Sequence, residues 1–551
     1  MRLALSLFAS LLTLPACGGG GSGPSGTDGG APDAEVADDG GTELRDGGAD
    51  ARVDVDAGPP PLRDCEGDYV VRTRAELEAL YGCRTIGGSL TVDGLPGPDL
   101  GALSTLEEVG GDLAIRDAEI TTLTHLAGLT RVGGDLALED DEELGDLEGL
   151  GALARIGGTL SITSMRDLET LAGLGPVTTL AALRVEENGA LADLAGLAGL
   201  TNVEGDVLVA GHLALTSLDG LDDLASVGGD LNLIRDWALS DLGALAAIEE
   251  VEGRLTVDRA PELASLEGLS ALERVGGALT FSQVDALASL AGLSALASYG
   301  GLQVSDAPAL TSLDGLPAAS ALDFVLLEDA PELDDLGALA GLESISGNLT
   351  LARLPRVSDL APFADLAQVL GDLILDDLAV VDLSGLGSLA GTVRSLQLRR
   401  LPALRSVAGL GAVSSFGELL VESNDLLEDL AELPPVTTAW RIRVAFNPSM
   451  TDLGGLGSVT RTQDLSIEGN PLLAGLGGLE GIGVVGNDLE LVANAALRDL
   501  DPLAALSRVG RDLRVEGNVA LPMCAVDALV ARVDVGGDVT ASGNTGTGSC
   551  D

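Results

Sequence analysis

Histidines, cysteines and carboxylates are the side chains of this chain that could do chemistry, and their spacing does not favour catalysis. The only two histidines, His125 and His212, lie far apart in the sequence. No His-x-x-x-His, Cys-x-x-Cys, Gly-x-Ser-x-Gly or phosphate-cradling glycine loop is present, so the spacings typical of metal and nucleophile sites are missing. Paired carboxylates remain, and an acidic chain contains these by chance. We therefore expect a protein without enzymatic activity.

A recurring aspartate could bind cations. It stands directly before a Leu-x-Val-type step in nine places, of which the last four are Asp464, Asp488, Asp512 and Asp538. If the four stack, like charges about 5 Å apart repel by roughly 1 kcal/mol even in bulk water. Either Ca²⁺ bridges them, or each is the acceptor of an Asx turn and backbone N–H groups hold its charge. We expect the turn, with the calcium ladder as the alternative; no other cofactor is predicted.

Arginines and aromatic residues interrupt the acidity in one region. The members of this group are Arg399, Trp440, Arg441, Arg443 and Phe446. Trp and Arg are favoured anchors of interfaces, so the group is the candidate partner-binding patch. The alternative is structural, with Arg399 and Arg441 forming ion pairs across neighbouring strands. Glu418 and Glu422 would supply the carboxylates, and the aromatic side chains would pack at the edge of a coil.

A repeat after Gly88 must position these residues. It reads Gly-Asp-Leu-x-Val and, six residues later, Leu-x-x-Leu-x-Gly-Leu-x-x-Leu-x-x-Val-Gly. The first apolar residue of the Leu-x-Val step, here called the anchor, recurs at 90, 113, 136, 160, 183, 207, 231, 255, 279, 302, 325, 349, 373, 396, 419, 442, 465, 489, 513 and 539. All twenty anchors are Leu, Val or Ile, and the residue two positions later is always apolar. A fixed period in the twenties indicates a solenoid.

The spacing within each coil predicts its local structure. Period-two apolar residues at the anchor predict a short strand, and stacked strands predict a parallel sheet and a rod about 90 Å long at roughly 4.8 Å per coil. The three-residue spacing elsewhere suits turns, 3₁₀ segments or second short strands. Asparagine stands five residues after seven anchors, at Asn188, Asn424, Asn447, Asn470, Asn494, Asn518 and Asn544. We expect these asparagines to satisfy buried backbone groups at a bend.

Cysteines mark both ends of the array. Cys65 and Cys83 flank Thr73-Arg74-Ala75-Glu76, a capping-box sequence, with Leu77, Leu80 and Tyr81 placed on one helical face. Cys524 opens a predicted short helix through Arg532, and Cys550 lies next to the end of the sequence. Four thiols in an exported protein allow three pairings. Two staples, Cys65–Cys83 and Cys524–Cys550, are the economical choice, one for each end.

The first 64 residues are predicted to export and tether the rest. Residues 1–16 combine an arginine with an apolar run too short to span a bilayer. Leu14-Pro15-Ala16-Cys17 resembles the lipobox of bacterial lipoproteins, which implies lipidation of Cys17, and Gly18 in place of Asp favours the outer membrane. The alternative is an ordinary secretory peptide. Residues 17–64 are rich in Gly, Asp and Pro and are predicted to be a disordered tether.

Composition bounds the partners. The formal net charge is −56 and every basic residue is Arg, so binding to nucleic acid or to anionic lipid headgroups is disfavoured. Apolar residues make up 46% of the chain, but only eleven residues are aromatic, so Leu, Val and Ala must fill the core. The expected organisation is a cap at 65–89, a solenoid at 90–521 and a second cap at 522–551, in a monomer.

The N-terminal cap and the repeat resemble a known family. Residues 83–92, Cys-Arg-Thr-Ile-Gly-Gly-Ser-Leu-Thr-Val, resemble the start of receptor L domains, the leucine-rich, right-handed β-helical ectodomains of insulin- and EGF-type receptors. The resemblance covers about residues 65–551, with more coils than an L domain and without the cysteine-rich modules. The array is also similar to exported bacterial leucine-rich-repeat proteins. The resemblance implies a rigid binding surface without catalysis, and it carries over no binding residue.

The sequence thus predicts a cell-envelope lipoprotein with a leucine-rich parallel-β solenoid of about 20 coils. We expect it to bind an extracellular or periplasmic protein or glycan, like an adhesin or receptor, at the bacterial outer membrane, either surface-exposed or facing the periplasm. The alternative is a stiff structural spacer with no specific ligand. The membrane contact would come from the lipid anchor alone.

Overall fold

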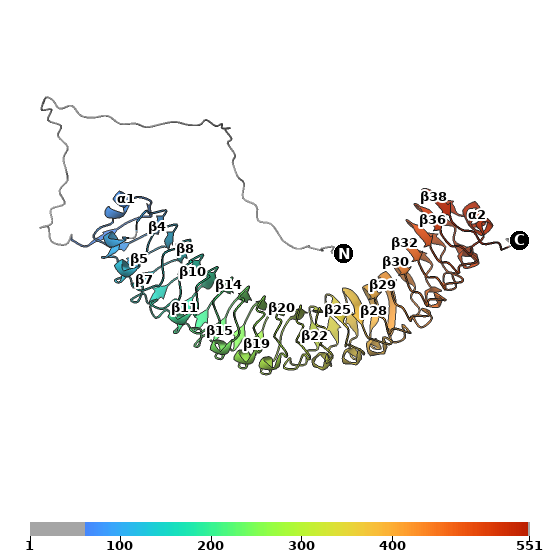
Figure 1. The fold of residues 1–551 in the computed structure, drawn as a ribbon, viewed down its shortest axis with the longest axis horizontal. Coiled ribbons are helices and arrows are strands. Elements are labelled where there is room, and N and C mark those ends of the chain that lie inside the picture. The colour runs from blue at the N-terminus through green and yellow to red at the C-terminus, as the bar shows by residue number, and fades with distance from the viewer. Residues whose placement is uncertain (1–60, 98, 549–551) are drawn as a thin grey trace, which may run out of the picture. The chain divides into compact units, whose positions relative to one another are not determined.

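The computed structural model describes residues 61–97 and 99–548, which all belong to one folded unit. Within this unit the chain winds into stacked coils that form an arc (Figure 1). The predicted signal sequence, Cys17 and most of the predicted tether lie outside the described residues, as does Cys550. Among the described residues, no helix is long and apolar enough to cross a bilayer.

A single long parallel sheet runs through the coils. Its 21 strands, counted over residues 61–97 and 99–548, are β2 (Tyr69–Val71), β4 (Leu90–Asp93), β6 (Leu113–Arg116), β8 (Leu136–Glu139), β10 (Thr159–Thr163), β12 (Ala182–Glu186), β14 (Val207–Ala210), β16 (Leu231–Ile234), β18 (Leu255–Asp258), β20 (Ala278–Ser282), β21 (Gly301–Ser305), β23 (Val325–Glu328), β25 (Leu349–Leu354), β27 (Asp372–Leu378), β28 (Ala390–Arg399), β29 (Ala412–Glu422), β30 (Thr438–Ala445), β32 (Asp464–Glu468), β34 (Leu489–Val492), β36 (Leu513–Glu516) and β38 (Val539–Ser542). Each strand pairs with the next in sequence order, so β2 and β38 are the two edges.

The twenty predicted anchors form one column of this sheet. Leu90 is paired with Leu113, and the column continues coil by coil until Leu513 pairs with Val539. The repeat register is therefore confirmed. The structure adds one strand that the repeat did not predict, because Tyr69 of β2 pairs with Leu90. Every anchor is buried except Val539, which is 43% exposed because no further coil covers it.

The opposite wall consists of short strands and 3₁₀ turns, as the three-residue spacing predicted. The short strands are β1 (Arg63–Cys65), β3 (Cys83–Ile86), β5 (Glu108–Val109), β7 (Arg131–Val132), β9 (Arg155–Ile156), β11 (Thr179–Leu180), β13 (Asn202–Val203), β15 (Ser226–Val227), β17 (Glu250–Val251), β19 (Arg274–Val275), β22 (Ala321–Leu322), β24 (Ser344–Ile345), β26 (Gln368–Val369), β31 (Arg461–Thr462), β33 (Val484–Val485), β35 (Arg508–Val509) and β37 (Asp534–Val535). The 3₁₀ helices of the described residues are Gly101–Leu103, Thr124–Leu126, Ala195–Leu197, Gly243–Leu245, Glu267–Leu269, Ala291–Leu293, Gly337–Leu339, Ala361–Phe363, Ser384–Leu386, Gly454–Leu456 and Asp501–Ala505.

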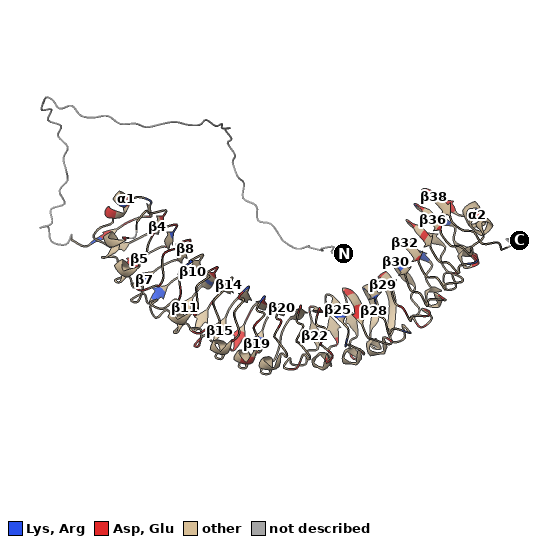
Figure 2. Ribbon diagram, in the orientation of Figure 1, with Lys and Arg blue, Asp and Glu red and all other residues tan. Residues whose placement is uncertain are grey.

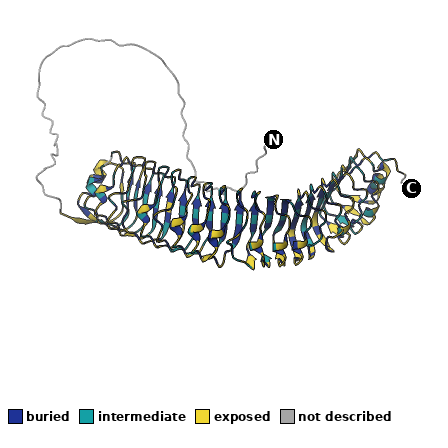
Figure 3. Ribbon diagram, turned by 60° about the horizontal axis from the view of Figure 1, so that its bottom comes forward, coloured by how far each residue is buried: buried dark blue, intermediate teal, exposed yellow. Residues whose placement is uncertain are grey.

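The solenoid is curved, whereas the sequence predicted only a rod. The long sheet lines the concave side of the arc in Figure 1. Strand pairing holds the coils at one close spacing on that side, while the loops and 3₁₀ turns of the other wall are wider, so each coil is rotated slightly against its neighbour. Buried residues recur as stripes across successive coils, with exposed residues between them (Figure 3).

A bend follows each long strand, and buried asparagines hold it together in the last coils. Asn447 shows the arrangement: its Oδ1 accepts a hydrogen bond from the Asn424 backbone N–H at 3.0 Å, and its Nδ2 donates to the Val421 carbonyl oxygen at 3.0 Å. The same bonds recur from Asn424 to Asn544. Their predicted structural role is confirmed. The residue before this position has a left-handed φ in all twenty coils, including Ala493 at 56°.

Each end of the array carries a helix. Helix α1 (Arg74–Glu78) has the predicted capping box, in which Thr73 accepts from the Glu76 N–H and the Glu76 carboxylate accepts from the Thr73 N–H. Leu77 and Leu80 are buried, but Tyr81 is 49% exposed because the helix ends before it. Helix α2 (Met523–Arg532) replaces the turn of the last coil, which explains the final spacing of 26 residues. Figure 1 shows the two helices at opposite ends of the arc.

Disulfide bonds accompany both end helices. Cys65 of β1 and Cys83 of β3 are bonded to each other. Cys524 in α2 is also disulfide-bonded, and its predicted partner, Cys550, lies outside the described residues. The pairing Cys524–Cys550 therefore stays a prediction.

Candidate functional site

The three arginines of the predicted patch share a depression on the concave sheet. Arg399 is the last residue of β28, and Arg441 and Arg443 alternate along β30, so all three point to the side opposite the buried anchors. They line a depression of about 450 Å³. Its carboxylates come from the neighbouring strands and are Glu418, Glu422, Asp464, Asp488 and Glu490. Positive and negative side chains therefore alternate across adjacent strands.

Ion pairs fix two of these arginines. Arg441 lies 3.4 Å from Glu418 and 3.6 Å from Asp464, and Arg443 lies 3.0 Å from Glu468. The predicted Arg441–Glu418 pair is confirmed. The pairing predicted for Arg399 is wrong, because Glu422 lies within ion-pair distance of Arg443 instead.

Arg399 faces a buried carboxylate without a direct hydrogen bond to it. Asp376 is its register partner on β27, and both Arg399 Nε and Asp376 Oδ1 are buried without a hydrogen-bond partner among the described residues. Burial raises the pKa of Asp376, and the nearby guanidinium groups of Arg400 and Arg399 oppose this shift. Arg400 takes the other oxygen of Asp376, at 2.6 Å. A polar atom of a bound molecule could therefore satisfy both open groups.

The aromatic members of the predicted patch lie elsewhere, so the patch is not one cluster. Trp440 precedes Arg441 in β30, is 65% exposed, and lines a second depression of about 490 Å³ together with Phe416. Phe446 follows β30, has a left-handed φ of 58°, and is 46% exposed beside Gly469. The sequence placed these residues on neighbouring coils correctly, but it could not show that they leave the strand in different directions.

The aspartates before the anchors are held by backbone donors, but not by those of their own turns. Asp488 Oδ1 accepts from the Asp512 N–H at 3.1 Å, and Asp512 Oδ1 accepts from the Asp538 N–H at 2.9 Å. The expected Asx turn is therefore wrong, because the donor belongs to the next coil. Asp464 instead pairs with Arg441. Over the described part of the chain, no group of three or more His, Cys, Asp or Glu residues is placed to hold a metal ion.

Both histidines have structural surroundings. His212 and Asp236 occupy the asparagine position of adjacent coils, are fully buried, and contact each other at 2.7 Å between Nδ1 and Oδ1. The Asp236 carboxylate also accepts from the His212 backbone N–H at 3.1 Å, as an asparagine would. His125 Nε2 lies 3.6 Å from Asp99. The His212–Asp236 pair therefore stabilises the bend and does not face a substrate.

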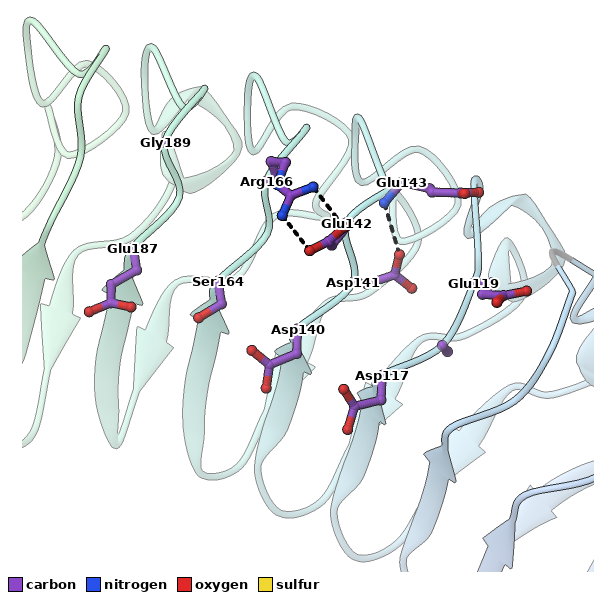
Figure 4. Close-up of a pocket in the computed structure, with 11 residues that line it drawn as sticks. Asp117, Glu119, Asp140, Asp141, Glu142, Glu143, Ser164, Arg166, Glu187 and Gly189 are labelled. Atoms are coloured by element: carbon purple, nitrogen blue, oxygen red, sulfur yellow. Dashed lines mark hydrogen bonds and ion pairs between the residues drawn. The ribbon is translucent and has the colours of Figure 1, made fainter. Parts of the chain in front are cut away.

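An acidic depression of about 710 Å³ was not predicted (Figure 4). It lies where the long strands of the early coils end, and its carboxylates are Asp117, Glu119, Asp140, Asp141, Glu142, Glu143 and Glu187. Arg166 also lines it and forms two hydrogen bonds to Glu142. Burial raises the pKa of Asp141 to about 6. The consecutive acidic residues 140–143 were the available sequence signal, and the depression suits a cationic group.

Comparisons with known proteins concern the fold alone. No protein-family model and no curated protein matches the chain. Among solved structures, an internalin (inlF) from Listeria monocytogenes is 18% identical with a TM-score of 0.32, over 62% of this chain and 88% of that one. A TLR13–ssRNA13 complex is 13% identical with a TM-score of 0.25, over 86% and 88%. The Leptospira interrogans LRR protein LIC12759 is 14% identical with a TM-score of 0.24, over 85% and 99%.

The strand registers describe the architecture independently of these distant likenesses. One parallel strand per coil, Leu-rich inward columns and a buried asparagine row recur through the described coils. The chain is a leucine-rich-repeat-type solenoid built on a long parallel sheet.

Proposed function

We propose that this protein is a non-catalytic recognition protein of the bacterial envelope that binds a protein or glycan partner on its concave sheet. The observation that carries the proposal is the depression around Arg399, Arg441 and Arg443. Its charged side chains come from several adjacent strands, and ion pairs already hold Arg441 and Arg443 in position. A preorganised polar surface loses less conformational entropy on binding than a flexible one.

The contrast between the inward and outward columns also supports recognition. The anchors repeat as Leu, Val or Ile, whereas the next residue, which faces outward, varies from Thr91 to Arg184, Leu208 and Glu490. A spacer requires only the repeating core. A recognition surface also requires different outward groups at defined places, and this sheet provides them. Acidic residues lie along the whole arc, so the arginines of the depression interrupt a mainly negative surface (Figure 2).

Attachment to the outer membrane through lipid on Cys17 is part of the proposal. The lipobox-like sequence Leu14-Pro15-Ala16-Cys17 supports it. Two or more acyl chains anchor a protein stably, whereas one chain binds only reversibly. Metabolic labelling with a radioactive fatty acid should mark the wild type and leave Cys17→Ala unlabelled. Label that persists in Cys17→Ala would contradict lipidation at this residue.

Binding is tested with the full chain in detergent, fluorescently labelled and titrated onto cells that lack the protein. We expect a saturable isotherm that Arg443→Glu weakens at least about tenfold, since the substitution places a carboxylate between Glu422 and Glu468. Arg155→Glu is the matched charge control, because Arg155 lies on the short strand β9 of the other wall. Linear, non-saturable association, or equal loss in both variants, would favour a spacer without a specific ligand.

A further inference from the structure

The long sheet changes shape in three consecutive coils. Strands β28, β29 and β30 contain 10, 11 and 8 residues, whereas the neighbouring β32 and β34 contain 5 and 4. The extra residues extend each strand at its N-terminal end. In these coils the short strand of the other wall and the long strand are therefore continuous, and the sheet is locally wider.

Missing glycines explain the widening. Most coils have Gly-Gly or a similar pair three and two residues before the anchor, and a Cβ at Gly133 would collide with the Gly110 carbonyl oxygen of the preceding coil. The corresponding residues of β30 are Ala439 and Trp440. Without the glycine pair the backbone stays extended, and the Trp440 side chain points into solvent with 65% of its surface exposed.

A depression of about 490 Å³ lies on this widened region, and its lining is chemically unusual for the chain. It contains the Trp440 indole, hydroxyl groups from Thr392, Ser415 and Thr438, and the side chains of Gln463 and Arg461. Unlike the two depressions described above, it is lined by no Asp or Glu. It also shares no lining residue with the arginine depression of the concave sheet.

The hydroxyl groups form a row across the strands. Thr392 is paired in register with Ser415, and Ser415 with Thr438. The Thr392 and Ser415 hydroxyls are 2.6 Å apart. Arg461, at the edge of the depression, is exposed and has no ion-pair partner within the described residues. In a chain with 86 acidic residues, an arginine without a carboxylate partner is available to an external one.

We propose that this depression is a saccharide site that takes a hexuronate-containing glycan. One face of a pyranose ring carries C–H groups that pack on an indole, and its hydroxyl groups exchange hydrogen bonds with short hydroxyl and amide side chains. A guanidinium group binds a carboxylate through two parallel hydrogen bonds, so Arg461 matches the acid group of a uronate. The three features of the depression correspond to the three features of this ligand.

An extended peptide fits the same place less well. Peptides that bind at sheets usually add a strand to an open edge and use its free backbone groups. Here β29 is paired with β28 on one side and with β30 on the other, so its backbone is already occupied. The ligand must therefore be recognised by side chains alone, which favours a hydroxyl-rich molecule. The site names a ligand class beside the concave surface, and either assignment can fail without the other.

The two tryptophans of the chain allow a direct test. In Trp237→Phe the sole indole is Trp440, and in Trp440→Phe it is Trp237, which lies in the distant coil of β16. The full chain in detergent is titrated with tetragalacturonate, cellotetraose and tetraglutamate while tryptophan emission is recorded. We expect tetragalacturonate to change the emission of Trp237→Phe saturably and to leave Trp440→Phe unchanged.

Arg461→Gln in the Trp237→Phe background tests the carboxylate contact. The Kd for tetragalacturonate should rise about tenfold, while Arg405→Gln, which removes another exposed arginine that lacks an ion pair among the described residues and is absent from the depression, should leave it unchanged. Cellotetraose should bind at least about tenfold more weakly than the uronate. No emission change with tetragalacturonate, equal affinity for cellotetraose, or equal affinity for tetraglutamate would overturn the proposal. Loss of the folded circular-dichroism spectrum is checked for each variant, and Trp440→Ala provides a second loss of the platform.

Discussion

Removal of one asparagine from the buried row should loosen the solenoid locally. Asn470 is fully buried and makes four side-chain hydrogen bonds. Its Oδ1 accepts from the Asn447 backbone N–H at 3.0 Å and from the Asn447 side chain at 3.3 Å. Its Nδ2 donates to the Val444 carbonyl at 3.0 Å and to Asn494 at 3.3 Å. Asn470→Ala removes all four bonds and introduces no larger side chain.

The size of the effect follows from the groups left behind. The Asn447 N–H and the Val444 carbonyl would stay buried without a partner, and each such group costs about 1–3 kcal/mol, so we expect a loss of roughly 2–6 kcal/mol. Solenoids do not always unfold in one step, because their stability is a sum of coil and interface contributions. A local measurement is therefore preferable to a melting temperature alone.

Hydrogen exchange provides that measurement. In Asn470→Ala, the Asn447 amide should exchange about 30-fold faster or more, since each 1.4 kcal/mol corresponds to a factor of ten. Asn232→Ala is the matched control, because Asn232 lies on the outward side of β16 and has no side-chain hydrogen bond to another described residue; its effect should stay within about 0.5 kcal/mol. Unchanged protection of Asn447, or equal loss in both variants, would refute the structural role of the row.

Three further predictions concern the bends and the aspartates. Ala493→Gly should stabilise and Gly517→Ala destabilise the fold by about 1 kcal/mol each in urea titrations, because both positions have a left-handed φ, and opposite signs would refute this. Asp141→Asn should stabilise by about 1–3 kcal/mol at pH 7 but not at pH 4 in a pH series of urea midpoints, because a folded pKa of about 6 above the ordinary 3.8 lowers stability as pH rises between them. Millimolar Ca²⁺ should leave the Tm unchanged, since Asp488 and Asp512 already accept backbone N–H groups; a rise would support the calcium ladder.

The capping box and the asparagine row could be predicted because both depend on local or strictly repeated environments. Thr73 and Glu76 are three residues apart, so their reciprocal bonds require no distant partner. Asn447 and Asn470 have equivalent surroundings because the coil between them has the same length as its neighbours. The partner of Arg399 could not be predicted in this way, since Glu422 is within reach of both Arg399 and Arg443 and side-chain geometry decides between them.

The sequence alone determined the solenoid, the column of anchors, the 3₁₀ character of the turns and the two end helices. A period of 23 or 24 residues returns each apolar residue to the same place in the next coil, so any register other than the observed one would expose Leu and Val side chains. Only the tertiary structure decided which outward side chains meet. It separated Trp440 and Phe446 from the arginines, collected the acidic depression, and transferred the aspartate hydrogen bonds to the following coil. These features depend on strand length and on contacts between residues about one coil apart, and neither is visible in a single repeat.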